Sequence, residues 1–62
     1  MPAVRLDPRA ERLLLHGQTV RPSERVAPGA MRAYDTKGRF LGLVEGRPDG
    51  QVRPQRLFVT PP

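Results

Sequence analysis

One short stretch near the start of the chain has the apolar spacing of a helix. Its apolar residues fall on one face of a 3.6-residue period and are Ala10, Leu13 and Leu14. Asp7 can accept hydrogen bonds from the free N–H groups of a first turn, and Pro8 suits the first helical position. Gly17 can end the helix in a left-handed conformation. We therefore predict a helix at about 8–16, too short to be stable unless its leucine face packs on a sheet.

The second half of the chain changes to short alternating apolar and polar runs separated by turn residues, which is typical of strands. We expect strands at about 30–34, 39–47 and 51–59, with turns at 35–38 and 48–50. The polar connection before them contains two further candidates for short strand positions, Val20 and Val26.

The two expected hairpins define a register that the burial of side chains can test. A four-residue first loop pairs Tyr34 with Arg39, and a three-residue second loop pairs Glu45 with Arg53. One face then collects the apolar residues Met31, Ala33, Phe40, Val44 and Phe58. The other face collects Arg32, Tyr34, Arg39, Leu41, Leu43, Glu45, Arg53 and Leu57. We expect Met31, Phe40 and Phe58 to lie inside.

Three residues indicate local irregularities in the expected sheet. Gly42 falls opposite Met31, where it leaves room for a large side chain or for another backbone. Pro54 cannot donate to a ladder, so it indicates an edge strand or a bulge. Arg56 falls on the apolar face, which indicates either a bulge near Pro54 or an arginine whose stem lies over Gly42 with its head group in water.

The chain has 62 residues, enough for one domain with a small core. A meander with apolar residues on both faces needs cover on both, and barrel-like closure with a docked helix supplies it. We therefore predict a single domain over 1–62 with a mainly β fold: a small β pseudo-barrel with one short N-terminal helix.

The formal charge is +5, with 11 Lys and Arg against 6 Asp and Glu, and all the basic residues but Lys37 are arginine. The planar guanidinium fork matches phosphate, so this bias favours a nucleic-acid partner. Codon usage rich in G and C also enriches arginine and is an equal alternative explanation.

The chain's chemistry argues against an enzyme. With no Cys and one His, the sequence excludes disulfides, thiol catalysis and a structural zinc site. No paired carboxylates or Ser/His/Asp arrangement suggests catalysis, and we expect no cofactor. No apolar run approaches a membrane span, and the start lacks a signal-peptide apolar region, so we expect no membrane contact. The lack of Cys fits a cytoplasmic location, and we also expect a monomer.

Four segments in order resemble the C-terminal domain of bacterial TruB-type tRNA pseudouridine synthases: residues 16–20, 31–35, 38–43 and 52–58. The resemblance implies a PUA-like fold and an accessory, non-catalytic role in binding tRNA for isomerisation of a T-loop uridine. It also implies a second partner, the separate catalytic domain of the parent synthase, which holds the catalytic Asp in that family.

The segment from Leu6 to Ala10 is similar to the family's catalytic loop, which also contains Leu-Asp-Pro-x-Ala. Here Glu11 and Arg12 replace the small hydroxyl residue and the glycine that should follow. A helix cap explains Asp7 completely, and we prefer it to a catalytic nucleophile.

The candidate RNA-binding residues are Arg32, Tyr34, Arg39, Arg53 and Arg56. In the expected register the first three share a face, where guanidinium groups can bind phosphates and the ring can stack. Simple cross-strand pairing, including an Arg53–Glu45 ion pair, is the alternative. Two other functions stay open: a stand-alone basic RNA-binding barrel, and a protein-interaction module that uses Leu41, Leu43 and Leu57.

Overall fold

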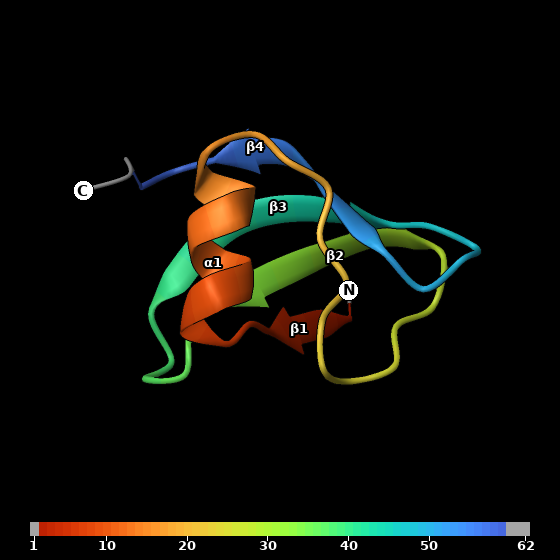
Figure 1. Ribbon diagram of the computed structural model, residues 1–62, viewed down its shortest axis with the longest axis horizontal. Coiled ribbons are helices and arrows are strands. Elements are labelled where there is room, and N and C mark those ends of the chain that lie inside the picture. The colour runs from red at the N-terminus through yellow and green to blue at the C-terminus, as the bar shows by residue number, and fades with distance from the viewer. Residues whose placement is uncertain (1, 60–62) are drawn as a thin grey trace.

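The computed structural model describes residues 2–59. The elements in chain order are β1 (Ala3–Arg5), α1 (Pro8–Leu15), β2 (Gly29–Tyr34), β3 (Phe40–Gly46) and β4 (Val52–Leu57) (Figure 1). The predicted mainly β class with one short N-terminal helix is confirmed, and the bounds of the three predicted strands differ from those of β2, β3 and β4 by at most two residues at either end.

The helix begins and ends where its capping residues predict. The Oδ1 atom of Asp7 accepts a hydrogen bond from the backbone N–H of Ala10 at 2.7 Å, and Pro8 occupies the first turn. The helix ends at Leu15, and Gly17 follows with a φ of 86°. Because Asp7 caps the helix, its side chain has the structural role that we preferred.

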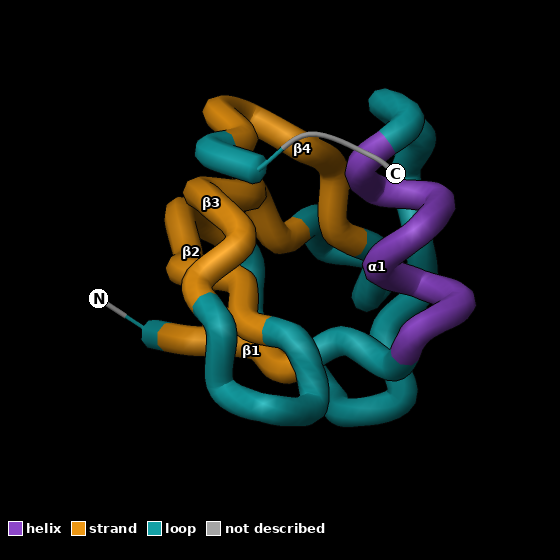
Figure 2. The backbone as a smooth tube through the Cα atoms, turned by 90° about the vertical axis from the view of Figure 1, so that its left-hand side faces the viewer, coloured by secondary structure: helices purple, strands orange, loops and turns teal. Residues whose placement is uncertain are grey.

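The four strands form one sheet in the order β1-β2-β3-β4, with β1 parallel to β2 and the other pairs antiparallel. Figure 2 shows this sheet on one side of the molecule and α1 on the other. The sequence analysis missed β1, whose Val4 pairs with Ala33. Its three residues carry too little alternation to indicate a strand, and its partner is distant in the chain.

The expected barrel-like closure does not form among residues 2–59, because β1 and β4 are the two edges of an open sheet. The connection 18–28 joins these edges instead, passing beside α1 (Figure 1). At the β4 edge, Val20 and Val52 exchange two backbone hydrogen bonds of 2.8 Å. At the β1 edge, the Oε1 atom of Glu24 accepts from the backbone N–H of Arg5 at 2.7 Å. Val26 lies in a loop, so its candidate strand is wrong.

The register predicted for the first hairpin is wrong. The backbone N–H of Asp35 donates to the carbonyl of Arg39 at 3.0 Å, so Arg39 belongs to the turn and does not pair with Tyr34. Tyr34 pairs with Phe40, and Leu41 is an extra residue before the ladder resumes. This bulge turns Leu41 into the core and Phe40 outward.

The second hairpin has the predicted start and an irregularity near Pro54. Glu45 pairs with Arg53 as expected. Beyond Pro54, Gln55 is an extra residue, and Arg56 pairs with Leu43. The bulge is therefore the correct one of the two alternatives for Arg56, and it keeps this arginine on the same face as Arg53.

These two bulges change the core. Met31 is buried as expected, but Phe40 is 36% exposed and Phe58 is 57% exposed, so their predicted burial is wrong. The core is aliphatic and consists of Val4, Leu6, Ala10, Leu14, Val20, Met31, Ala33, Leu41, Val44 and Val52. Since α1 contributes Ala10 and Leu14 to it, the helix covers one face of the sheet and leaves the other face to solvent.

Two glycines allow close approaches inside the sheet. A Cβ atom on Gly42 would overlap the backbone oxygen of Arg56 and lie 2.8 Å from the Cα atom of Leu57. The predicted close approach of another backbone at Gly42 is therefore confirmed. Room for Met31 comes from Gly46 instead, where a Cβ would lie 2.7 Å from the Met31 Cε atom.

Candidate nucleic-acid interface

We call the sheet face turned away from α1 the outer face. Its residues follow from the strand register and from their exposure: Ala3, Arg5, Ala30, Arg32, Tyr34, Phe40, Leu43, Glu45, Arg53, Arg56 and Phe58. They form parallel rows across the strands, since residues paired in a sheet project from the same side. In one row Arg5, Tyr34 and Phe40 are neighbours, and Phe58 continues it.

Positive charge dominates the outer face. It carries Arg5, Arg32, Arg53 and Arg56 and the single carboxylate Glu45. The Nε atom of Arg53 lies 3.0 Å from Glu45 Oε1, which is the ion pair named as the alternative role of Arg53. Both side chains are about half exposed, so the pair contributes little to stability. Within residues 2–59, Arg5 and Arg56 form no salt bridge.

All three aromatic residues of the chain lie in one row on this face. The ring centroids of Tyr34 and Phe40 are 5.6 Å apart with the planes tilted by 58°. Those of Phe40 and Phe58 are 5.7 Å apart with the planes at 27°. We call Tyr34, Phe40 and Phe58 the aromatic row.

Of the five predicted RNA-binding residues, Arg32, Tyr34, Arg53 and Arg56 share the outer face, but Arg39 does not. Arg39 lies in the first turn, where its Nη2 atom is 3.1 Å from Glu11 Oε2 and its Nε atom is 3.3 Å from Asp35 Oδ2. The expected grouping of Arg39 with Arg32 and Tyr34 is therefore wrong, because it depended on the incorrect first register.

The apolar patch of Leu41, Leu43 and Leu57, which the protein-interaction alternative requires, does not form: of the three, only Leu43 lies on the outer face. Leu41 is fully buried, and Leu57 pairs with Gly42 and packs against the core. Phe40 and Phe58 are the exposed large apolar side chains among residues 2–59. The sequence analysis missed Arg5 because it did not find β1. It placed Phe40 and Phe58 inside because it did not find the bulge at Leu41 and did not extend the bulge near Pro54 to Phe58.

Asp35 organises the first turn. Its Oδ1 atom accepts hydrogen bonds from the backbone N–H groups of Lys37 at 2.9 Å and Arg39 at 2.8 Å. The Arg39 N–H bond, with help from the Lys37 N–H and the charges of both side chains, lowers the pKa of the Asp35 carboxyl, and partial burial opposes this shift. The charged form therefore stabilises the turn.

We expect acid to weaken the fold through this carboxylate. Because the folded-state pKa is below the ordinary value of 3.8, the stabilisation is present above pH 3.8 and is lost as the pH falls through the lowered pKa. The substitution Asp35→Asn should remove this part of the decline in the free energy of unfolding. Denaturant titrations at pH 6 and at stepwise lower pH measure it. Asp49→Asn removes the same charge from the second turn and is the matched control; equal changes in both variants would contradict a special role for Asp35.

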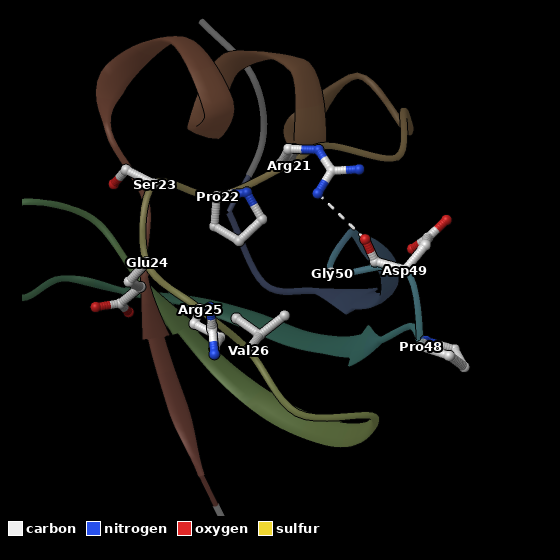
Figure 3. A pocket seen from close by; sticks show the side chains of 9 residues that line it. All are labelled: Arg21, Pro22, Ser23, Glu24, Arg25, Val26, Pro48, Asp49 and Gly50. Atoms are coloured by element: carbon white, nitrogen blue, oxygen red, sulfur yellow. Dashed lines mark hydrogen bonds between the residues drawn. The ribbon is translucent and has the colours of Figure 1, made fainter.

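A shallow hollow of about 470 Å³ lies between the connection 18–28 and the second turn. Figure 3 shows Arg21 reaching across to this turn, where its Nη1 atom donates to the backbone oxygen of Asp49 at 3.1 Å. The carboxylates of Glu24 and Asp49 point away from each other at opposite ends (Figure 3). This hollow therefore holds no paired carboxylates for acid–base chemistry.

Residues 2–59 contain no group of three or more His, Asp or Glu side chains that could hold a metal ion. In the same part of the chain, no helix has the length and apolar character needed to cross a membrane. The outer face is thus the main feature of chemical interest.

Comparison with known proteins identifies the chain's relatives. The family described as "Pseudouridine synthase II TruB, C-terminal" matches residues 2–58. The chain belongs to this family. As a TruB C-terminal domain, it is similar to the tRNA pseudouridine synthase B of Stutzerimonas stutzeri (strain A1501), with 39% identity over 57 residues. The resemblance found in the sequence is confirmed.

Two further relatives bear the same name. The protein from Pseudomonas aeruginosa (strain UCBPP-PA14) is 39% identical over 57 residues, which cover 92% of this chain and 19% of that protein. The protein from Ectopseudomonas mendocina (strain ymp) is 44% identical over 46 residues, 74% of this chain and 15% of that protein. This TruB C-terminal domain therefore spans about a fifth of the length of its relatives.

Proposed function

We propose that this domain binds tRNA with its outer face and takes no part in uridine isomerisation itself. The observation that carries the proposal is the gathering of Arg5, Arg32, Arg53 and Arg56 around one carboxylate on one open sheet face. Arginines in such an arrangement neutralise phosphates without reading sequence. The relatives are named for tRNA, which makes tRNA the RNA to test.

The accessory role has its own support. Asp7, in the segment similar to the family's catalytic loop, is used as the cap of α1. His16, the single histidine of the chain, is exposed at the end of that helix and is not enclosed in a site for proton transfer. We propose that the domain acts as a monomer attached to a catalytic domain of a tRNA pseudouridine synthase, and a role on tRNA implies a cytoplasmic location.

Binding to tRNA should depend steeply on salt. If about three phosphates are neutralised, affinity falls about 40-fold between 50 and 200 mM salt. Fluorescence anisotropy of labelled tRNA, titrated with the 62-residue chain at both concentrations, measures this effect. Affinity that does not change with salt, or no binding at 50 mM, contradicts the proposal.

A pair of arginine variants should separate the outer face from the first turn. Arg56→Ala is expected to lower tRNA affinity about 3- to 10-fold and to reduce the salt slope by about one. Arg39→Ala, the matched control, should change affinity less than about twofold, because this guanidinium is already paired with Glu11 and Asp35. The same tRNA titrations compare them, and the opposite ranking would move the interface to the turn.

A further inference from the structure

The aromatic row does not belong to the core. The largest fully buried side chains are aliphatic, and they fill the space between the sheet and α1 without any ring. More than half of the Phe58 side chain is exposed, and Phe40 is more than one third exposed. A single exposed phenylalanine is ordinary, but Phe40 and Phe58 are in ring contact and form an exposed apolar surface together. Such contiguous apolar surface is typical of interaction sites.

Two local features place these rings outside. The bulge at Leu41 moves Leu41 into the core and Phe40 to the outer face. The bulge at Gln55 similarly restores Arg56, and with it Phe58, to that face. A regular ladder in either hairpin would have turned the ring or the arginine inward. Both irregularities thus serve the same surface, and bulges commonly redirect side chains at functional sites.

The surroundings of the rings indicate what they bind. Arg5 is the cross-strand neighbour of Tyr34 at one end of the aromatic row. Arg56 lies two residues before Phe58 on the same face, and neither arginine forms a salt bridge within residues 2–59. A ligand that complements this surface has flat apolar rings and closely spaced negative charges. Unpaired nucleotides have both, whereas the bases of a duplex are stacked inside it.

We infer that one or two unpaired nucleotides of the bound RNA stack on Phe40 and Phe58, with their phosphates beside Arg56 and Arg5. This inference rests on the proposed function and adds a preference to it. The domain then selects a single-stranded or looped part of its RNA, while the arginines alone would accept any phosphate backbone.

The test compares two RNAs with the same number of phosphates, a labelled single-stranded oligouridylate and a blunt duplex. The 62-residue chain should bind the single strand more tightly. Phe58→Leu keeps apolar bulk but removes the ring, and it should lower single-strand affinity about tenfold and duplex affinity less than about twofold. Phe58→Tyr keeps the ring and should retain wild-type affinity. Arg56→Ala should weaken binding to both RNAs.

A folding control and an NMR readout accompany these titrations. Because Phe58 and Arg56 are both exposed, the three variants should keep the wild-type circular dichroism and melting temperature. Ring-proton NMR shifts of Phe58 provide a direct readout of stacking in the wild type. Equal wild-type affinity for the two RNAs, or an equal loss in Phe58→Leu, overturns the stacking inference and leaves phosphate binding standing. No binding to either RNA overturns both proposals. Ring shifts produced by an added synthase catalytic domain, and not by RNA, would reassign Phe40 and Phe58 to domain docking and overturn the inference.

Discussion

Replacing Gly42 by alanine should remove a large part of the stability of the fold and lower its melting temperature steeply. The new Cβ atom would overlap backbone atoms of Arg56 and Leu57, which can move only if β4 separates from β3. The φ of 150° adds strain for any residue with a side chain. Overpacking and backbone strain together cost about 3–5 kcal/mol, against a total stability of roughly 3–9 kcal/mol for a chain of this length.

Thermal unfolding followed by circular dichroism measures this loss, and Gly38→Ala is the matched control. Gly38 has a φ of 87° but nothing within 4 Å of an added Cβ, so its substitution introduces strain without a collision. We expect a loss of about 1 kcal/mol there. If both variants melt at the same temperature, the close approach of β4 to Gly42 does not limit stability.

The second large effect is expected for Leu14→Ala. Leu14 is fully buried and attaches α1 to the core. The eight residues of this helix do not hold a helical conformation alone, so they depend on such contacts. Truncation of a buried leucine costs about 2–5 kcal/mol, a large share of the stability available to the domain.

Leu13→Ala provides the comparison for Leu14, since it makes the same change at the preceding position of the same helix. Leu13 is only partly buried, so its loss should be about half as large. Urea titrations of both variants give the free energies of unfolding. A larger loss for Leu13 would show that the helix packs on the sheet with a different face.

The elements predicted correctly from the sequence are those with local signals. Asp7, Pro8 and Gly17 are capping residues whose preferences act within one turn, and they define α1. The second turn likewise determines the Glu45–Arg53 pair, because its loop has the three residues that the sequence predicts. Such features require no knowledge of the rest of the fold.

The elements that were missed depend on contacts between distant residues. β1 exists because Val4 finds Ala33 in a parallel pairing. The first register failed because the Asp35 side chain holds two backbone N–H groups and extends the turn to Arg39. Alternation also could not predict the bulge at Leu41, where one leucine displaces a phenylalanine from the core.

Part of the candidate interface was predicted from the sequence, and the part that was misplaced depended on the first register. Arg53 was placed on the correct face because its pairing with Glu45 was predicted correctly. Arg32 and Tyr34 were also placed correctly, because an error of two residues in the first register preserves the side to which a residue points. The error at the turn misplaced Arg39, which pairs with carboxylates instead. Whether the outer-face residues contact RNA stays a prediction, which the titrations described above test.

The connection 18–28 has a consequence for solubility. An open sheet normally offers two rows of unused backbone groups on which a second molecule can add a strand, and this leads to fibrils. At the β4 edge, the backbone N–H and C=O of Val52 are already hydrogen-bonded to Val20, and Pro54 has no backbone N–H to donate. At the other edge, β1 is only three residues long, and the side chain of Glu24 accepts the hydrogen bond of the Arg5 backbone N–H. Concentrated solutions of the protein should therefore stay free of β-aggregates even though the sheet never closes.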